Sequence, residues 1–547
     1  MRNVDIESFP GAVMAAKAPT TLFHPTLSAS VTGVVATDVL TLATGTTPTT
    51  GTAVKPTTTT SGVTANTVYF INRIDDTTCY LYNNITNADT GGGTGRIDIT
   101  ATTAFTIATV NQGTINHIIR EPTLGTRFYH DSNGRVWYLT DGGTRVRLLF
   151  NSVLDNAVAA SGALANANGR GISTFQNSDA SAAYLFAFRN ALIDVINVTA
   201  GSNLTTPSWT NSWQTMNTGA GVNNSHHSIL AQDNIVYFCD SRFIGSIREA
   251  SGEIFNPATG TTYTFNSSAL DTPQREVLEW LEELGANLLA SGATWNKIYP
   301  WDRVSDSYNL PLIVPENNVQ RLKNIGNLVY ILAGRWGNIY TTQGTYVRHF
   351  KKIPDQVVNN SATLQSNPIT WGGIDAVNGA LLFGMSVQTT GNSGAYLLYP
   401  DGRLIIDNMP STGSGNVTAL EVQNNFYQMG YASGADSFST SRYADYEGVV
   451  QSQFYRVATV TEKATYSVLE AVIAKPAATG GNIRISYRTN TSGSFTTIDT
   501  FASDGAATTF QTPGIGLMNI ENIQVQIEID DGSLPTDIEL LEVRLLP

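Results

Sequence analysis

A repeat of short apolar and aromatic segments is the feature of this sequence that most limits its fold. Each segment pairs two strand-like runs across a turn, and the segments recur through residues 109–447. Their centres are Val136–Tyr138, Tyr184–Phe188, Ile235–Phe238, Leu288–Leu289, Leu328–Leu332, Ala380–Phe383 and Asn425–Tyr427. The mean spacing of about 48 residues is the period of a four-stranded propeller blade. The repeat therefore predicts a β-propeller of seven blades.

The composition favours an all-β fold for the whole chain. Charged residues are only 14% of the 547 residues, while hydrophobic residues are 41%. Lys, Glu and Arg normally cover exposed helix faces, so their scarcity argues against a helical protein. The chain is instead rich in threonine and holds 48 glycines, which suits strands separated by turns.

The composition also changes along the chain and predicts four segments. Residues 1–30 have little periodicity, and we expect either an arm that lies along a neighbouring subunit or an ordinary leading strand and loop. Residues 109–447 are the propeller. Residues 448–547 alternate apolar and polar positions, which predicts a C-terminal β-sandwich of the jelly-roll type.

Residues 31–108 are threonine-rich and predict a small β-domain inserted before the propeller. Threonine suits the exposed face of a strand, because its branched Cβ fits the pleat while its hydroxyl meets water. We expect strands at four alternating runs, which are Val39–Leu42, Thr67–Ile71, Thr78–Tyr82 and Arg96–Thr100.

One passage of the propeller region fits two structures. Pro273–Leu289 has apolar residues at helical spacing with glutamates between them, namely Val277, Leu281, Leu284 and Leu288. The passage also fits two strands around a turn at Leu284–Asn287. We favour strands, because the following Leu288–Tyr299 suits a blade hairpin.

The charge and the cysteines exclude several classes of protein. A formal charge of −13 argues against a protein that binds nucleic acid by neutralising phosphates, but it suits a wall past which DNA slides. No apolar run is long enough to span a membrane, and the N-terminus lacks the apolar centre of a signal peptide. Two distant cysteines, Cys79 and Cys239, exclude a disulfide framework.

The sequence predicts no catalytic, cofactor-binding or metal-binding residue, and we expect a protein that is not an enzyme. Glycosidase chemistry needs only two carboxylates, but each candidate is better explained as a solvated or turn-capping residue. These candidates are Glu282, Glu283, Asp302 and Asp306. The same explanation holds for possible calcium ligands at Asp75–Asp76 and Asp530–Asp531. His226 and His227 are adjacent and would point to opposite faces of a strand, and the glycine run Gly91–Gly95 lacks the Lys of a phosphate-binding loop.

Two further motifs are predicted to be structural. Asp131–Thr140 has an Asp, a Gly and a Trp at the spacing of a turn-and-strand motif found in propellers. We expect Asp131 to accept turn N–H groups, Gly134 to supply a positive φ, and Trp137 to pack between blades. Trp301–Asp302 occupies a comparable place after Lys297–Tyr299.

Several short motifs resemble structural proteins of tailed-bacteriophage virions. They are Arg2–Gly11, Lys297–Arg303 followed by Leu310–Pro315, and Val329–Tyr340. Asp38–Ala43, Thr67–Asn84 and Gly91–Thr100 similarly resemble a small β module of phage tail proteins. The role that these resemblances imply is a propeller-bearing tail protein similar to the nozzle or hub of short-tailed phages.

The resemblance implies a mechanical function in the virion. Copies of such a protein form a ring, sixfold by analogy, that extends the tail conduit, lets DNA pass without sequence-specific binding, and anchors adaptor and fibre proteins. Three alternatives stay open. The first is a receptor-binding or fibre protein that recognises host glycans, and the second is a propeller glycosidase or depolymerase. The third is a cellular or secreted propeller lectin.

Overall fold

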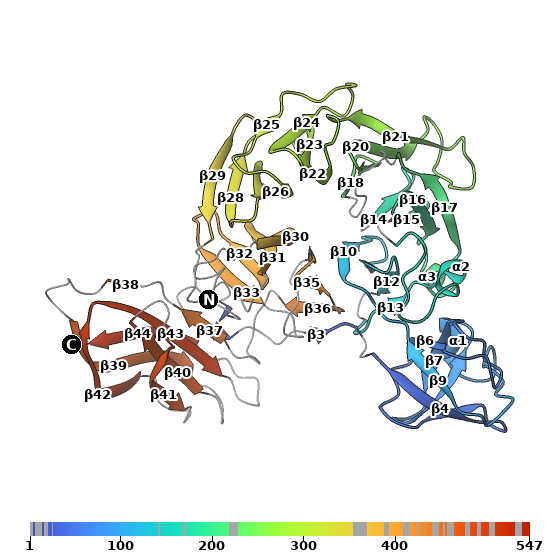
Figure 1. Ribbon diagram of the computed structural model, residues 1–547, viewed down its shortest axis with the longest axis horizontal. Coiled ribbons are helices and arrows are strands. Elements are labelled where there is room, and N and C mark those ends of the chain that lie inside the picture. The colour runs from blue at the N-terminus through green and yellow to red at the C-terminus, as the bar shows by residue number, and fades with distance from the viewer. Residues whose placement is uncertain are drawn as a thin grey trace.

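The structure is a ring of β-sheets with a small barrel and a further pair of sheets beside it (Figure 1). This computed structural model describes residues 4–5, 14–15, 20–23, 26–140, 143–167, 171–217, 228–353, 369–387, 393–408, 416–423, 426–432, 434–439, 448–451, 455–456, 464–475, 482–489, 494–502, 509–530 and 539–546. Within them, helix is confined to three short pieces, α1 (Ile85–Thr90), α2 (Ser152–Asp155) and α3 (Gly201–Thr205). The chain is therefore an all-β protein, as its composition predicts.

Seven four-stranded antiparallel sheets form the ring. The first three are β10 (Ile115–Arg120), β11 (Arg127–Asp131), β12 (Val136–Leu139) and β13 (Arg147–Leu148); β14 (Gly171–Gln176), β15 (Ala183–Arg189), β16 (Leu192–Asn197) and β17 (Trp209–Thr215); and β18 (Ile229–Gln232), β19 (Ile235–Asp240), β20 (Phe243–Glu249) and β21 (Tyr263–Asp271). The next three are β22 (Leu278–Leu284), β23 (Asn287–Gly292), β24 (Lys297–Trp301) and β25 (Leu312–Ile313); β26 (Val319–Ile325), β27 (Leu328–Ala333), β28 (Asn338–Thr342) and β29 (Val347–Lys352); and β30 (Ile369–Val377), β31 (Ala380–Val387), β32 (Gly394–Leu398) and β33 (Leu404–Asn408). The last joins β34 (Ala419–Gln423), β35 (Phe426–Tyr431) and β36 (Gly434–Ser439) to β3 (Thr20–Thr21).

The first strands of these sheets line the centre of the ring and close it. Each first strand contacts the first strand of the next sheet, and β34 contacts β10. Strand pairing also closes the ring, since Thr20 and Thr21 of β3 form an antiparallel ladder with Ser437 and Asp436 of β36. This arrangement is a β-propeller, and each of the seven predicted repeat centres has residues in a different sheet.

The burial of each strand follows from its place in its sheet. All seven residues of β15 are buried, because both faces of this second strand are covered by neighbouring sheets. The outermost strand β29 contains only exposed and half-buried residues instead. Six of the seven repeat centres predicted from the sequence lie on such second strands, while the first centre, Val136–Tyr138, lies on the third strand β12.

The ambiguous passage Pro273–Leu289 contains strands, with β22 and β23 joined at Gly285–Ala286. Of the residues at helical spacing, Leu281 and Leu288 are buried, while Val277 and Leu284 are half-buried. The pairing of β22 with β23 shifts register between Leu278 and Trp280, and this bulge brings the buried Leu278 and Leu281 to one side. A similar register shift occurs in β10 and in β26. The buried residues three apart are Ile115 and Ile118 in β10, and Val319 and Leu322 in β26.

The threonine-rich segment folds as a closed six-stranded barrel. Its strands are β4 (Ser28–Val34), β5 (Val39–Leu42), β6 (Ala53–Pro56), β7 (Tyr69–Arg73), β8 (Thr78–Tyr82) and β9 (Phe105–Thr109). The predicted boundary at residue 30 falls inside β4, and β3 of the predicted arm is a strand of the ring. In the chain, the barrel lies between β3 and β10.

The strand predicted over Arg96–Thr100 is wrong, because the structure has only a single bridge there, between Tyr82 and Arg96. Ile97 and Ile99 alternate toward the barrel core without joining a ladder. The backbone N–H of Ile99 donates to the Asp38 carboxylate at 3.0 Å, so a side chain holds this segment. The last barrel strand is β9 instead.

The C-terminal region consists of two sheets. One contains β37 (Gly448–Gln451), β43 (Asn522–Asp530), β40 (Asn482–Arg488) and β41 (Thr496–Ala502), with β38 (Tyr455–Arg456) paired to β43. The other contains β42 (Thr509–Ile520), β39 (Ala464–Lys475) and β44 (Glu539–Leu546). Leu469 and Ala471 of the second sheet share a buried cluster with Ile483 and Ile485 of the first. The N-terminal hairpin of β1 (Val4–Asp5) and β2 (Met14–Ala15) contacts β37 and β43, so part of the predicted arm lies on its own chain.

We predict that Phe23→Ala lowers the free energy of unfolding by about 3–5 kcal/mol, because it empties a buried site directly beyond the closing strand. Phe23 is 4% exposed and lies edge-on to Trp137, with 5.4 Å between the ring centroids. Chemical denaturation measures the change. Val304→Ala, at a position that is 87% exposed, is the control and should change the value by less than about 0.5 kcal/mol.

Candidate functional site

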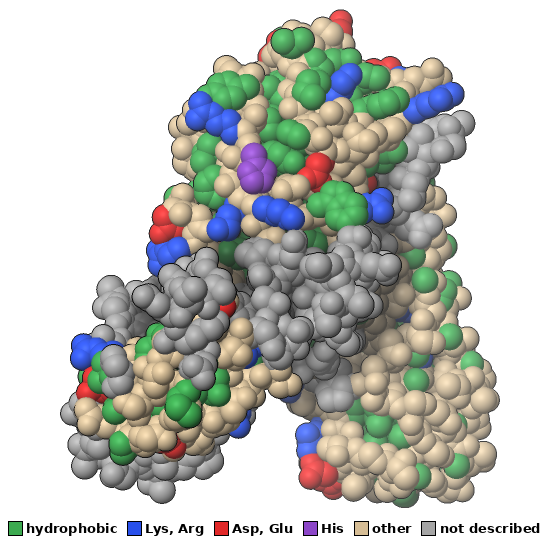
Figure 2. Space-filling model, turned by 60° about the vertical axis from the view of Figure 1, so that its left-hand side comes forward, with side chains coloured by type: hydrophobic (Ala, Val, Ile, Leu, Met, Phe, Trp, Pro, Cys, Tyr) green, Lys and Arg blue, Asp and Glu red, His purple; other side chains and the backbone are tan. Residues whose placement is uncertain are grey.

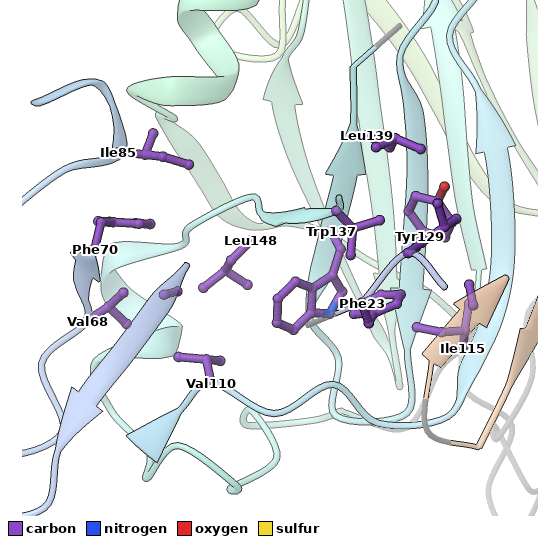
Figure 3. Close-up of a cluster of buried hydrophobic side chains, with 14 of the residues drawn as sticks. Phe23, Val68, Phe70, Ile85, Val110, Ile115, Tyr129, Trp137, Leu139 and Leu148 are labelled. Carbon is purple, nitrogen blue, oxygen red and sulfur yellow. The ribbon is translucent and has the colours of Figure 1, made fainter. Parts of the chain in front are cut away.

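The junction between the barrel and the ring is an extensive buried site that draws on three parts of the chain. One hydrophobic cluster contains Phe70 and Ile85 from the barrel, Trp137 from the first sheet, and Ala435 from the closing sheet. Figure 3 shows Trp137 and Phe23 in the middle of this cluster, with the barrel residues on one side and Tyr129 on the other. The barrel and the ring therefore share one core.

A buried charge cluster lies at the same junction. Lys55 of β6 donates to the backbone carbonyls of Asp155 and Val158, the latter at 2.7 Å. Arg135, in the turn before β12, is paired with the Asp155 carboxylate at 3.1 Å, and both side chains are almost fully buried. Arg135 also donates to the backbone carbonyl of Asn111 at 3.1 Å. We call Lys55, Arg135 and Asp155 the junction triad.

Burial sets the titration of the junction triad. It raises the pKa of Asp155, against the opposing effect of the Arg135 charge. It lowers the pKa of Lys55 to about 8, although the Asp155 carboxylate opposes this shift. Lys55 is therefore still mostly protonated at neutral pH. Arg135 then binds the Asp155 carboxylate directly, the Lys55 charge lies near it, and backbone carbonyls accept from both cations.

The short helix α2 carries Asp155 into the junction. Asn151 caps this helix by accepting from the backbone N–H groups of Val153 and Leu154, and Asp155 in turn accepts from the N–H of Asn151 at 2.9 Å. Asn156 then accepts from the backbone N–H of Val68 in the barrel at 2.8 Å. A small cavity of about 20 Å³ lies beside Phe23 and Trp137. These contacts suit a structural joint.

We predict that Asp155→Asn lowers the free energy of unfolding by about 3–5 kcal/mol, because it leaves two buried cations without their carboxylate. Urea denaturation monitored by tryptophan fluorescence measures the effect.

Asp401→Asn is the matched control for this prediction, since it breaks an ion pair with Arg403 whose side chains are 54% and 57% exposed. It should leave the stability nearly unchanged, because solvent screens an exposed ion pair. Equal effects of the two substitutions would contradict the role of the junction triad.

The centre of the ring carries a second polar cluster, on the first strands of several sheets and on β11. Lys323 of β26 pairs with Asp375 of β30 at 2.7 Å, and Asp375 accepts from the backbone N–H of Val422 in β34 at 2.7 Å. Glu421 of β34 pairs with Arg127 of β11 at 2.9 Å. These contacts connect consecutive sheets. We call Glu282, Lys323, Asp375, Glu421 and Arg127 the central belt.

The surroundings raise the pKa of two carboxyl groups of the central belt. Burial raises the pKa of Glu282 to about 7, which the nearby Lys323 charge only partly offsets. Burial also raises the pKa of Glu421, against the effect of Arg127. On the same first strands, burial and the charge of Arg321 lower the pKa of His117 to about 4, and its Nδ1 accepts from the backbone N–H of Ile172 at 2.9 Å. His117 is therefore neutral at pH 7.

The structure separates the four carboxylates considered from the sequence. Glu282 and Glu283 lie on β22, near the centre of the ring. Asp302 lies on the loop after β24, where it caps a turn by accepting from the N–H groups of Val304 and Ser305. Asp306 lies on the same loop.

Among the other sequence candidates, Asp530 is the last residue of β43, while Asp75, Asp76 and Gly91 lie in loops. Asp75 accepts from the N–H groups of Thr77 and Thr78, and Asp76 pairs with Arg73. Gly91 ends α1 with a φ of +72°. Asp531, His226 and His227 lie outside the described residues. Among the residues that are described, no three His, Cys, Asp or Glu side chains could hold a metal ion together, and no helix could cross a membrane.

The predicted role of Asp131–Thr140 is confirmed. Asp131 accepts from the backbone N–H groups of Asn133 and Arg135, both at 2.9 Å, and from the indole N–H of Trp137 at 2.9 Å. Gly134 has a φ of +79°. Trp137 is buried in the cluster that joins the barrel to the first and closing sheets. Both cysteines are buried and neither forms a disulfide, and burial raises the pKa of Cys79 to about 12.

Two buried glutamate–tyrosine pairs were missed from the sequence, although they recur at almost the same spacing. The carboxylate of Glu276, before β22, accepts from the Tyr299 hydroxyl of β24 at 2.6 Å. Glu316, before β26, accepts from the Tyr340 hydroxyl of β28 at 3.0 Å. The separations of 23 and 24 residues are the signal that could have found them.

We predict that Glu282→Gln stabilises the protein more at pH 8 than at pH 4.5, by about 1–2 kcal/mol. With a raised pKa, Glu282 in the folded state keeps a proton that the unfolded chain loses between pH 4.5 and 7. Its contribution to stability is therefore complete below pH 4.5 and is lost as the pH rises through 7. Glutamine does not ionise, so the Glu282→Gln protein keeps this contribution to stability as the pH rises.

Urea unfolding of both proteins at pH 4.5 and pH 8 measures the difference, and Glu283→Gln on the same strand controls for the lost charge. If the difference in stability between Glu282→Gln and the natural chain is the same at pH 4.5 and pH 8, the raised pKa of Glu282 is contradicted.

Comparison with known proteins adds similarity of fold only. No protein-family model matches the chain, and no curated protein matches it. Solved structures that match include the designed protein Ika8 (TM-score 0.36, 11% identity, 60% of this chain and 96% of that one). An inactive variant of virginiamycin B lyase from Staphylococcus aureus matches with a TM-score of 0.39 and 11% identity, over 60% of this chain and 94% of that one. The β-propeller domain of Cps50 (Swd1) from Myceliophteria thermophila matches with a TM-score of 0.40 and 10% identity, over 60% of this chain and 96% of that one. These scores are too low to carry any statement about function.

Proposed function

We propose that this protein is a structural component of a bacteriophage tail, in which copies form a nozzle- or hub-like ring of the DNA ejection conduit. The observation that carries the proposal is the junction triad together with the shared core beside it. A part of a conduit has to keep its shape while DNA passes and fibres pull on it. A barrel that shares a buried core with the propeller moves with it as one body. The sequence resemblance to tail proteins points to the same role.

The proposed architecture has three units, each of which can present a separate contact surface. We infer a seven-bladed propeller from the seven four-stranded sheets, with the threonine-rich barrel inserted between β3 and β10. We infer a C-terminal β-sandwich from the two sheets that share the cluster around Leu469 and Ile485. In a ring, the propeller would form the wall, while the barrel and the sandwich would bind neighbouring copies, adaptor proteins or fibres.

The charge of the chain suits a path for DNA. A net charge of −13 would repel phosphate groups and keep DNA from adhering to the wall of a ring. In the central belt, by contrast, acids and bases are paired with one another. We therefore place the DNA path in the lumen between copies and outside the centre of each propeller.

The experiment that tests this proposal is mass photometry of the purified full chain, followed by negative-stain imaging. We expect a closed ring with an open channel, with six copies by the resemblance. A stable elongated trimer would contradict the conduit and favour a fibre or receptor-binding protein.

One observation favours a second candidate function, the cleavage of a polysaccharide. Burial raises the pKa of Glu282 to about 7, and Asp375, which forms an ion pair with Lys323, lies on a nearby first strand. A protonated and an ionised carboxyl group are the pair that glycosidases use. Incubation with capsular polysaccharide, followed by a reducing-end assay, tests this candidate. Release of reducing ends by the natural chain and its loss in Glu282→Gln would support it, while no release would exclude it for that polysaccharide.

A further inference from the structure

Two exposed tryptophans occupy equivalent places in neighbouring sheets of the ring. Trp295 lies in the turn between β23 and β24 and is 45% exposed, and Trp336 lies in the turn between β27 and β28 and is 51% exposed. Both turns join the second and third strands of their sheets. The tryptophan precedes a buried Ile-Tyr pair in each case, Ile298–Tyr299 or Ile339–Tyr340. The same arrangement, an exposed turn tryptophan followed by a buried Ile-Tyr pair, is therefore repeated in two successive sheets.

Buried groups hold both turns in place. Glu276 accepts from the backbone N–H groups of Thr294 and Trp295, at 3.0 and 3.4 Å, while its other oxygen accepts from Tyr299. The carboxylate leaves no room for a side chain at Gly292, where a Cβ would lie 2.5 Å from it. The first tryptophan is thus presented by a turn fixed to a buried carboxylate.

The second turn is built in the same way. Glu316 accepts from Tyr340 and from the side-chain amide of Asn338, and a Cβ at Gly334 would overlap its carboxylate. The backbone carbonyl of Gly334 accepts from the Trp371 indole at 3.1 Å, and that of Arg335 accepts from the N–H of Ile369 at 3.0 Å. Neighbouring β30 therefore anchors this turn as well.

The surroundings of the two indoles indicate the chemistry of a ligand. The neighbours in the turns are polar, with Thr294 and Arg335 exposed and Asn296 and Asn338 half-buried. Figure 2 shows hydrophobic side chains dispersed among polar and basic ones on the part of the ring that carries β28 and β29. A protein-binding core would be a continuous apolar patch. A flat indole surrounded by hydrogen-bonding groups instead suits a ring that is apolar on its face and polar at its edge.

We infer that Trp295 and Trp336 form a binding site for an oligosaccharide, in which pyranose rings stack on the two indoles. The repeat of the constellation in successive sheets matches a ligand made of repeating units. Thr294, Asn296, Arg335 and Asn338 supply donors and acceptors for its hydroxyl groups. This site would add recognition of a surface polysaccharide to the structural role proposed above, and it does not depend on ring formation.

The test uses the full chain on an array of purified bacterial lipopolysaccharides and capsular polysaccharides. The best-bound polysaccharide is then cut to oligosaccharides and titrated by intrinsic tryptophan fluorescence. Trp295→Ala and Trp336→Ala should each weaken binding by about tenfold or more. Trp336→Phe should restore part of the affinity, because it keeps an aromatic face.

Tyr346→Ala is the matched control, since this residue is 53% exposed in the turn between β28 and β29, at the other end of the same sheet. Its affinity should equal that of the natural chain, and urea unfolding should show that all variants are folded. Absence of binding across the array would overturn the inference, as would binding that survives both alanine substitutions. Loss of self-association in the tryptophan variants without any polysaccharide binding would identify a protein contact instead.

Discussion

The burial of one carboxylate against two cations is the interaction on which the arrangement of the molecule depends. Asp155 lies where the barrel, the first sheet and the loop after β13 meet, and each part contributes a group to the junction triad. Such a cluster contributes little net stability, because desolvation of the charges offsets most of their attraction. Its consequence is specificity, since any displacement of the barrel would leave a buried charge unpaired. The barrel can therefore dock in one position only.

Strand contacts and paired charges likewise hold the ring together. Its first strands meet side by side around the centre, and the central belt pairs charges across those contacts. The short strand β3 completes the last sheet, and Leu22 and Phe23 continue directly from it into the core at the junction. Ring closure and barrel docking are thus adjacent in the chain. Pairing of β3 with β36 therefore favours docking of the barrel, and docking of the barrel favours that pairing.

The repeat of apolar second strands could be recognised from the sequence because both faces of these strands are buried, as β15 shows. The passage around Leu281 was ambiguous because a bulge places buried residues three apart, as a helix does. Arg96–Thr100 alternates like a strand, yet a side-chain contact from Asp38 holds it outside the ladder. The roles of Asp131 and Trp137 were predictable, since both depend on one local turn. The partners of Asp155 and Glu282 were not, because Lys55 and Lys323 reach them from distant parts of the chain.

The most direct test of this account is a pulsed electron–electron resonance measurement of the distance between the barrel and the ring. Both native cysteines are buried, so spin labels can be placed at Thr58→Cys on the exposed surface of the barrel and Val304→Cys on the ring. A rigid junction predicts one narrow distance distribution, which broadens when Asp155→Asn is added. A broad or divided distribution in the protein with an intact junction triad would contradict the claim that the barrel and the propeller form one body.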